Sequence, residues 1–428
     1  MMELKDKRIL VLGKGRTGTA ALRFLEGRCK MVSVKDEKED GPFSALDPRA
    51  YDLVVQSPGI SRQHPFLLEC DKAGIPVTNE IELAYLHTDA PIFGVTGTNG
   101  KTTISTLLHS ILQSCGRNSG LAGNVGQPLL DILEEGWDSF VLELSSYQLE
   151  GVSHFRPRVA IISNLTPDHL ERHKTMENYL RIKARIYENM GPEDSLILND
   201  DDPWLRGLDA KGPRIYYFSR THKVSGIFLR EGRIILNLGK EEELLPADAL
   251  EIPGGHNVEN AMAAILAAIL AGADPGCAAM AARKFPGVPH RLEFVRELEG
   301  VPYYNDSKAT NPEASITALS AFPGKRILVI LGGSQKKVSY KQLAAAIRDK
   351  GALAILQGST AGEIREQLQQ AGIKDFQETK TMTQAVDLCR GIARPGDVVL
   401  LSPACASFDQ FADFEARGEA FKEYVRSI

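Results

Sequence analysis

The chain has 428 residues, of which 43% are hydrophobic and 25% are charged, and its formal net charge is −5. This composition is typical of a globular protein with substantial cores, and the length predicts about three domains. The negative net charge offers no basic surface of the kind that binds a phosphate backbone, which excludes nucleic acid as an expected partner. A small anionic ligand held by local Lys and Arg side chains remains compatible with it.

Six cysteines are scattered along the chain without C-x-x-C spacing, which argues against a zinc site and against a disulfide scaffold. A reducing cytoplasm fits this usage best. The N-terminal residues lead directly into a strand without a signal peptide. The longest apolar helix, around residues 261–271, is Ala-rich and too short to span a bilayer, so we expect a cytoplasmic protein without a membrane segment.

Apolar strand-like runs alternate with helical patterns along almost the whole chain. This alternation predicts an α/β fold of mostly parallel sheets with helices on both faces. Pro and Gly interrupt the pattern near residues 88–91 and 286–290, which predicts three domains at 1–89, 90–288 and 289–428. The predicted strands cover residues 8–12, 53–56, 92–96, 140–144, 159–163, 195–198, 302–304, 326–331, 352–356 and 397–402.

The first glycine-rich turn, Gly13-Lys-Gly-Arg-Thr-Gly18, follows a strand and opens a helix, and Asp36 ends a second strand. This pattern is close to the dinucleotide fingerprint, although the same turn can bind any diphosphate, including that of a UDP-sugar. A nicotinamide cofactor, a diphosphate-bearing substrate and a purely structural turn are the three alternatives. We favour the diphosphate because a separate triphosphate loop follows. The candidate contacts are Gly15, Thr17, Asp36 and, after the strand at 53–56, Ser57.

The predicted strand at 92–96 runs into Gly97-Thr-Asn-Gly-Lys-Thr-Thr103, the most informative motif of the chain. In such a turn backbone N–H groups wrap a polyphosphate, a Lys neutralises the outer phosphates and a Thr hydroxyl reaches Mg²⁺. Val95 occupies the place of the usual first glycine, so the motif is a variant, and a turn that only caps a helix is the alternative. The predicted nucleotide contacts are Gly97, Thr98, Asn99, Gly100, Lys101, Thr102 and Thr103.

Two further strand ends carry candidate catalytic groups. Glu143 ends the apolar strand at 140–144, where a carboxylate downstream of a phosphate loop meets Mg²⁺ directly or through water. A buried capping carboxylate is the alternative. Asp168 and His169 follow the strand at 159–163, and we expect His169 in the site rather than in a purely structural role.

Lys183 falls within a helical stripe of apolar residues that extends from Met176 to Met190. An ammonium on an apolar face must snorkel to solvent, pair with a carboxylate or lose its charge, and the residues alone favour snorkelling. A neutral amine near a metal, however, can add CO₂ and become a carbamate that acts as an extra carboxylate ligand.

Later loops add polar residues. His256, Asn257 and Asn260 open an Ala-rich helix, where polar residues are often only caps. Asn305-Asp-Ser-Lys-Ala-Thr-Asn-Pro312 is denser in side-chain donors than a turn requires. It is joined by Gly332-Gly-Ser-Gln-Lys-Lys337 and Leu401-Ser-Pro-Ala-Cys-Ala-Ser407, each just past a predicted strand. Three loops at one sheet edge predict a pocket.

With these motifs assembled, the chain resembles the ATP-dependent Mur ligases of peptidoglycan synthesis over essentially its whole length. The phosphate loop, Thr166-Pro-Asp-His169 and Gly255-His-Asn-Val-Glu-Asn260 look like motifs of the wider family, which includes folylpolyglutamate synthetases. The loops at 305–311 and 401–407 are similar to the branch that adds D-glutamate. The resemblance implies a Rossmann-like domain for the UDP-substrate, a P-loop-type central ATPase domain and a C-terminal Rossmann-like domain for the amino acid.

The resemblance implies that a carboxylate of UDP-MurNAc-L-Ala attacks the γ-phosphate of ATP to give an acyl phosphate, which the amine of D-glutamate captures through a tetrahedral intermediate. The implied cofactors are ATP, Mg²⁺ at two sites and a lysine carbamylated by CO₂. Charge accumulates on the phosphates, so metals and lysines must carry much of the catalysis. The implied partners are these small molecules only, and the chain is expected to be a monomer.

Matching residue by residue, the resemblance assigns catalytic roles to Lys101, Glu143, His169 and Lys183, the last as the carbamylated lysine. Thr102, Glu143, His169 and Lys183 match metal ligands. Asn260, Arg291 and Asp306 match ATP contacts, and Asn124 matches a contact to the muramoyl group. The residues that match the D-glutamate pocket are Lys308, Thr310, Lys336, Ser407, Phe408 and Phe414.

Three departures and three alternatives accompany the resemblance. Phe408 stands where the family commonly has Leu, and Lys336 and Lys337 compete for a single family lysine, with spacing in favour of Lys336. Lys14 and Arg16 make the first loop more basic than usual. The alternatives are a sister or folylpolyglutamate-type ligase that adds another amino acid, an NAD-dependent oxidoreductase, and a nucleotide-binding module without turnover.

Overall fold

The structure is a computed structural model that describes residues 3–334 and 338–428. Its strands form sheets of four, nine and six strands. The chain divides into two compact units, one comprising Met1–Ala249 and Val258–Arg283, the other comprising Leu250–Asn257 and Lys284–Ile428. In the described part of the chain, no helix is long and apolar enough to cross a membrane.

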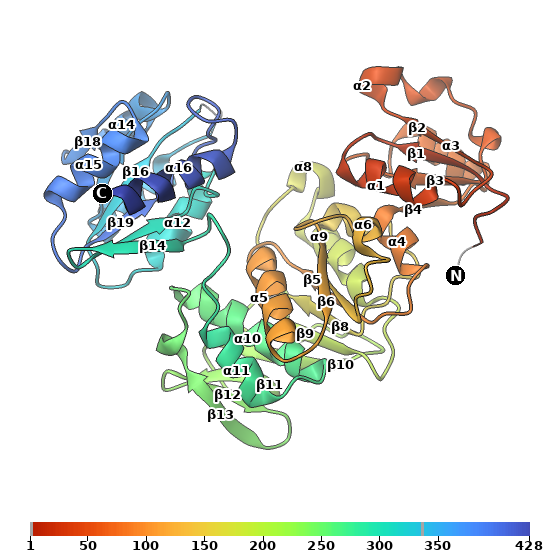
Figure 1. Cartoon of the computed structure of the whole chain (residues 1–428), viewed down its shortest axis with the longest axis horizontal. Coiled ribbons are helices and arrows are strands. Elements are labelled where there is room, and N and C mark those ends of the chain that lie inside the picture. The colour runs from red at the N-terminus through yellow and green to blue at the C-terminus, as the bar shows by residue number, and fades with distance from the viewer. Residues whose placement is uncertain (1–2, 335–337) are drawn as a thin grey trace. The chain divides into compact units, whose positions relative to one another are not determined.

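The first sheet is parallel throughout and has the strand order β2-β1-β3-β4 (Figure 1, red). Its strands are β1 (Arg8–Leu12), β2 (Met31–Lys35), β3 (Leu53–Gln56) and β4 (Val77–Asn79), and its helices are α1 (Arg16–Leu25), α2 (Glu37–Asp40), α3 (Pro65–Lys72) and α4 (Glu80–Tyr85). Short 3₁₀ turns occupy Phe43–Ala45 and Pro48–Ala50. Ile9 and Val11 pack in one cluster and Leu10 and Leu12 in another, so both faces of β1 are covered.

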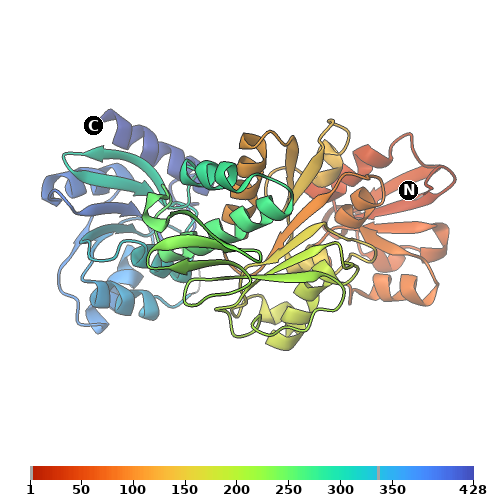
Figure 2. The same ribbon diagram turned by 90° about the horizontal axis from the view of Figure 1, so that it is seen from below.

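The second sheet contains nine strands in the order β13-β12-β11-β10-β9-β8-β5-β7-β6. Pairs from β6 to β11 are parallel, whereas β11, β12 and β13 pair antiparallel at one edge (green in Figure 2). The strands are β5 (Ile92–Thr96), β6 (Ser119–Gly123), β7 (Ser139–Glu143), β8 (Val159–Ile162), β9 (Ser195–Asn199), β10 (Arg214–Ser219), β11 (Gly226–Arg230), β12 (Arg233–Asn237) and β13 (Glu241–Pro246).

The helices associated with the central sheet lie between these strands or follow the last of them. They are α5 (Lys101–Ser114), α6 (Leu129–Ile132), α7 (Ser146–Leu149), α8 (Leu170–His173), α9 (Met176–Ala184), α10 (Gly255–Leu270) and α11 (Pro275–Arg283), with 3₁₀ turns at Arg185–Tyr187 and Ala247–Ala249. β5 lies between β7 and β8 and is parallel to both, so the loops that follow these three strands share one edge of the sheet.

The second unit contains the six-stranded sheet, with the order β14-β15-β19-β16-β17-β18 and a single antiparallel pair, β14 with β15. Its strands are β14 (Glu293–Leu298), β15 (Val301–Asn305), β16 (Ile327–Leu331), β17 (Leu353–Leu356), β18 (Phe376–Glu378) and β19 (Val398–Leu401). Its helices are α12 (Pro312–Ser320), α13 (Lys341–Lys350), α14 (Ala361–Gln370), α15 (Met382–Ile392) and α16 (Phe414–Ser427). Alternate residues of β16 enter two separate clusters, which shows that both faces are covered.

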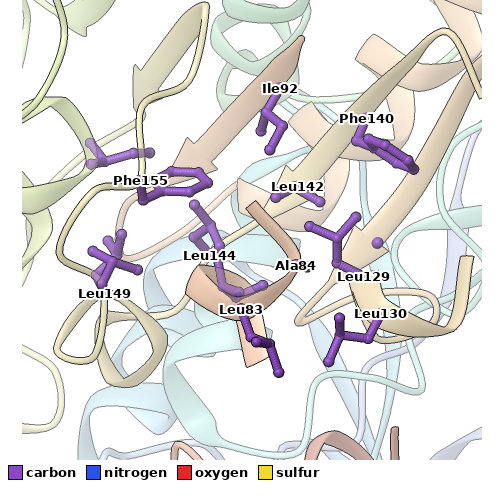
Figure 3. Packing of buried hydrophobic residues seen from close by; sticks show 14 of the residues in the cluster. Leu83, Ala84, Ile92, Leu129, Leu130, Phe140, Leu142, Leu144, Leu149 and Phe155 are labelled. Atoms are coloured by element: carbon purple, nitrogen blue, oxygen red, sulfur yellow. The ribbon is translucent and has the colours of Figure 1, made fainter. Parts of the chain in front are cut away.

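One hydrophobic core joins the first sheet to the central sheet within the first unit. Figure 3 shows Leu83 and Ala84 of α4 beside Leu142 of β7 and Leu144 just after it, with Phe155 close by. All five side chains are essentially excluded from solvent. The edges of both sheets are therefore held by a shared apolar core.

The predicted α/β class, with mostly parallel sheets and helices on both faces, is confirmed. Three local expectations are wrong. The stripe from Met176 is not one helix, because α9 ends at Ala184 and a 3₁₀ turn follows. Lys183 does not snorkel to solvent, because its side chain is buried. Lys14 of the basic first loop pairs its Nζ with Glu39 and Asp40 at 2.8 and 2.9 Å.

The third wrong expectation concerns the cysteines. Cys115 and Cys277 form a disulfide although 162 residues separate them, whereas the other four cysteines are free thiols. No short spacing in the sequence indicates this bond, because only the packing of α5 against α11 brings the two residues together.

Candidate active site

The phosphate-loop motif forms the turn between β5 and α5. Gly97 and Gly100 adopt φ angles of 141° and 82°, in the region that favours glycine. A Cβ on Gly97 would lie 2.0 Å from Ser163 Oγ, and a Cβ on Gly100 would lie 2.3 Å from Asn260 Oδ1. Both glycines are thus required by conformation and by close neighbours. Asn260, which was predicted as an ATP contact, is held beside the loop.

Lys101 begins α5, and its side chain folds back over the loop. Its Nζ donates hydrogen bonds to the carbonyl oxygens of Gly97 and Thr98, at 3.0 and 2.7 Å. Thr102 and Thr103 are buried in the first turn of the helix. Asn99 is exposed, and its backbone N–H donates to Asn164 Oδ1.

Lys183 is buried, with 1% of its surface exposed, which rules out the snorkelling that its residue pattern favours. Its Nζ donates to the Gly97 carbonyl oxygen at 2.7 Å and lies 4.6 Å from the centre of the Tyr179 ring. Burial, assisted by the nearby charge of Lys101, holds the pKa of the Lys183 amine well below its usual value. The amine is therefore directed at the phosphate loop in a setting that favours its neutral form.

Glu143 ends β7 and is also buried. Its Oε1 accepts a hydrogen bond from Asn124 Nδ2 at 2.7 Å, whereas its Oε2 has no hydrogen-bond partner. A buried carboxylate oxygen without a partner is costly unless a cation or water satisfies it. Glu143 does not cap a helix, so the capping alternative does not describe it.

His169 lies at the N-terminus of α8 in a left-handed conformation, with φ of 52°. It is partly exposed between two carboxylates, with Nε2 3.5 Å from Asp168 and Nδ1 3.6 Å from Glu171. Its ring also lies 5.1 Å from the ring of Tyr147. His169 therefore lies at the rim of the site.

A cavity of about 340 Å³ brings these groups together within the first unit. Lys101, Asn124, Asp168, His169 and Lys183 line it on the side of the central sheet. Arg16, Thr17 and Pro58 line it from the loops that follow β1 and β3. The strand order places these two loops at the switch point of the first sheet, where α/β proteins bind ligands.

The remaining candidates of the first sheet surround this switch point. Asp36 accepts hydrogen bonds from the backbone N–H groups of Lys14 and Lys38, at 3.2 and 3.0 Å. Gly15 caps α1 with open space around it. Ser57 Oγ is buried without a hydrogen-bond partner and packs against Gly13. Ser57 and Gly15 leave donors and space that a diphosphate could use.

Within the described residues, no three His, Cys, Asp or Glu side chains form a ready metal cluster. Mg²⁺, however, usually binds through one or two carboxylates and completes its octahedron with waters and substrate phosphates. Glu143 meets this requirement because its buried Oε2 lacks a partner. The chain therefore fits Mg²⁺ through Glu143, with a phosphate-bearing ligand supplying further oxygens.

In the second unit, Asp306 follows β15 and is buried. It accepts hydrogen bonds from Ser402 Oγ at 2.7 Å and from the Leu292 N–H at 3.2 Å. Burial outweighs these contacts and raises the pKa of the Asp306 carboxyl to about 7. Arg291 lies close by, and its Nε is buried without a hydrogen-bond partner. Both predicted ATP contacts of this unit thus share one locality.

Arg417 of α16 is a residue that sequence reasoning missed. Its guanidinium is buried and donates to Ser307 Oγ and the Ser307 carbonyl at 2.9 and 2.8 Å, and to the carbonyls of Cys405 and Ala406 at 3.1 and 3.2 Å. It thereby ties the loop after β15 to the loop after β19. The sequence does indicate that this residue is buried, because position 417 falls on the apolar stripe of the last helix, with Phe421 and Val425.

The predicted D-glutamate residues take different places around these two loops. Lys308 Nζ lies 5.6 Å from the Phe414 ring, and Thr310 follows in the same turn. Ser407 is buried, whereas Phe408 is 73% exposed and donates its N–H to Ser334 Oγ. Lys336, and its competitor Lys337, lie outside the described residues.

Two known protein-family domains and several known enzymes match this chain. The Mur ligase middle domain matches residues 95–268, and the Mur ligase glutamate ligase domain matches residues 290–405. The UDP-N-acetylmuramoylalanine–D-glutamate ligase of Pelotomaculum thermopropionicum is 42% identical over 99% of both chains. The chain belongs to the Mur ligase family. It is accordingly an ATP-dependent acid–amino-acid ligase, and the oxidoreductase and the binding module without turnover are set aside.

Two further proteins are similar to this chain. The enzyme of the same name from Acidobacterium capsulatum is 41% identical over 99% of this chain and 97% of its own length. A crystal structure of the MurF ligase from Thermotoga maritima, in complex with ADP, has a TM-score of 0.59 at 19% identity and covers 99% of this chain and 96% of its own. The second similarity shows a common fold.

Proposed function

We propose that this Mur ligase joins D-glutamate to UDP-N-acetylmuramoyl-L-alanine with conversion of ATP to ADP and phosphate, in peptidoglycan precursor synthesis. The cavity in which Lys101, His169 and Lys183 meet Asn124 carries the proposal. A cationic, polar cavity beside a glycine-rich loop suits attack on a terminal phosphate. The names of the relatives supply the two substrates.

The phosphate loop would bind ATP through the backbone N–H groups of residues 98–103 at the start of α5. On ATP binding, Lys101 Nζ would give up its hydrogen bonds to the carbonyl oxygens of Gly97 and Thr98 and would bind the outer phosphates instead. Asn260, beside Gly100, would help to orient the nucleotide. Arg291 and Asp306 are also proposed as ATP contacts.

Glu143, Thr102, His169 and a carbamylated Lys183 would hold Mg²⁺ at two sites. The ion supplies charge neutralisation where the phosphates accumulate negative charge. Carbamylation joins the neutral Lys183 amine to CO₂ and releases one proton, so the low pKa of this amine supports the modification. The resulting carboxylate would lie at the Gly97 end of the loop, where the amine now donates its hydrogen bond.

The substrate carboxylate would attack the γ-phosphorus of ATP and release ADP, leaving an acyl phosphate. The amine of D-glutamate would then attack the acyl carbon, and the tetrahedral intermediate would expel phosphate. Asn124 would contact the muramoyl group while Gly15, Thr17, Asp36 and Ser57 receive the uridine diphosphate. Lys308, Thr310, Ser407 and Phe414 would hold D-glutamate, because a cation and hydroxyls suit its carboxylates.

We further infer a cytoplasmic monomer whose domains extend over residues 1–89, 90–288 and 289–428. The three sheets support these limits, because β1–β4, β5–β13 and β14–β19 each fall within one range. Light scattering of the purified chain with and without ATP tests the monomer, and a mass above that of one chain would reject it.

The decisive experiment measures ADP release with ATP, Mg²⁺ and UDP-MurNAc-L-Ala, with D-glutamate, L-glutamate, another amino acid or no amino acid added. We expect turnover only when both the nucleotide sugar and D-glutamate are present. Turnover with another amino acid would assign the chain to a sister ligase, and absence of turnover in every mixture would overturn the proposal.

A further inference from the structure

A disulfide joins the C-terminal end of the phosphate-loop helix α5 to the first turn of α11. Cys115 caps the C-terminal end of α5, Cys277 lies in the first turn of α11, and their Cα atoms are 5.9 Å apart. Both residues are partly exposed. The bond therefore lies at the opposite end of α5 from the phosphate loop and is open to solvent thiols.

The hairpin of α10 and α11 contacts α5 at both of its ends. At the N-terminal end, Asn260 of α10 closes on Gly100. At the C-terminal end, Arg117 donates a hydrogen bond of 2.7 Å to the Gly272 carbonyl in the turn between α10 and α11. The disulfide reinforces this second contact, so it fixes how the hairpin packs on the helix that carries Lys101.

The disulfide lines a cavity of about 700 Å³, which is within the range of small-molecule sites. Arg117 and Arg158 contribute guanidinium groups to its wall, and Asp138 and Asp274 contribute carboxylates. A tripeptide disulfide such as glutathione disulfide carries carboxylates that guanidinium groups bind well. The cavity thus provides access to the sulfur atoms, and its guanidinium groups offer donors to a carboxylate of this class of reagent.

We propose that Cys115 and Cys277 are a reversible redox latch, closed by exchange with a glutathione-type disulfide, that stabilises the packing of α5 against α11. The inference is independent of the amino acid that the enzyme adds. Cys277 is the expected attacking thiolate, because the N-terminal end of a helix favours negative charge.

The exchange balances in two steps. The Cys277 thiolate attacks one sulfur of glutathione disulfide, which forms a mixed disulfide and releases one glutathione thiolate. The Cys115 thiolate then attacks the Cys277 sulfur and releases the second glutathione. The two cysteines are oxidised, glutathione disulfide is reduced to two thiols, and the protons lost by the cysteines pass to the released glutathiones.

Closing a cross-link across 162 residues restricts the unfolded chain, so the oxidised protein should resist heat better. We expect its Tm to exceed that of the reduced protein by at least about 5 °C. Addition of dithiothreitol should reverse the difference in the same sample.

The test uses the full chain after incubation with glutathione disulfide or dithiothreitol, followed by alkylation in denaturant and mass measurement. Six alkyl groups are expected after reduction and four after oxidation, with the Cys115–Cys277 peptide found by digestion. The Tm difference should be present in the wild type and in Cys29→Ser, a partly exposed control, and absent in Cys115→Ser and Cys277→Ser. Six alkyl groups after oxidation, a lasting glutathione adduct, or equal Tm values would overturn the latch.

Discussion

Four buried ionisable side chains lie in or beside the loops of the two candidate sites. Lys183 contacts the phosphate loop, Glu143 has an oxygen without a partner, Asp306 lies behind the loop after β15, and Arg417 joins two loops. Desolvation of such groups costs several kcal/mol unless hydrogen bonds or ligands offset it. A fold keeps such costly groups where a site needs them. The predictions at the scale of single residues therefore concern these few side chains.

Replacement of Lys183 by Ala should abolish ligation, because the position loses the amine that would become the carbamate. Lys183→Arg should not restore activity, since a guanidinium cannot be carbamylated and remains charged. ADP release measures both variants, and Lys174→Ala, on the exposed surface nearby, serves as the control with unchanged activity. Activity retained by either Lys183 variant would reject the carbamate.

Replacement of Arg417 by Lys should raise the KM for D-glutamate about tenfold or more, because the two pocket loops lose most of the hydrogen bonds that join them. The affinity for ADP should fall by a smaller factor than the KM rises, since most of the proposed nucleotide contacts belong to the phosphate loop in the other unit. Steady-state kinetics and calorimetry separate the two effects. Arg426→Lys, exposed on the same helix, is the control, and an unchanged KM in the Arg417 variant would contradict the positioning role.

At the scale of elements, the apolar patterns located many of the buried parallel strands but missed other parallel strands, among them β4, β6, β10 and β18. β1, β3 and β5 match their predicted limits, β8 differs by one residue at one end, and β7 and β19 differ by one residue at each end. The hairpin of β12 and β13 was missed, because Glu241, Glu242 and Glu243 lack the apolar alternation of a half-buried strand. The end of α9 at Ala184 was missed because a 3₁₀ turn continues nearly the same stripe.

The turn into α5 provides a test at this scale. Gly100→Ala should abolish nucleotide binding, because its φ of 82° strains an alanine and the new Cβ meets Asn260 Oδ1 at 2.3 Å. Gly116→Ala is a matched control, because it has φ of 75° at the other end of α5 with open space around it. It should lose only about 1 kcal/mol of stability and keep ADP affinity. Calorimetric titration with ADP distinguishes the two variants, and equal affinities would contradict the steric argument.

At the scale of the whole molecule, the first sheet and the central sheet are joined by the core around α4 and β7. Glu80, at the start of α4, reaches into this junction, where its Oε1 accepts a hydrogen bond of 2.8 Å from the Leu130 N–H. Its Oε2 has no partner, and burial raises the pKa of its carboxyl to about 7. Stability of the junction should therefore depend on pH.

The direction of this pH dependence follows from the raised pKa of the Glu80 carboxyl. The folded state binds the Glu80 proton more tightly than the unfolded state, so this stabilisation is complete below pH 4.5 and is lost as the pH rises through about 7. Between these two pH limits the wild type should lose on the order of 3 kcal/mol of unfolding free energy. Glu80→Gln should abolish this loss. Urea unfolding at pH 5 and pH 8 measures it, with the exposed Glu26→Gln as control. An identical pH dependence of the wild type and Glu80→Gln would reject this origin.

The sequence by itself determined the α/β class, many of the buried parallel strands and the glycine-rich phosphate loop, because side-chain periodicity and turn chemistry are local properties. Tertiary structure alone decided the burial of Lys183, the unpaired oxygen of Glu143, the loop tie through Arg417 and the bond between Cys115 and Cys277. Each depends on elements that are distant in the chain, and the desolvation and contacts that set their chemistry arise only when those elements pack.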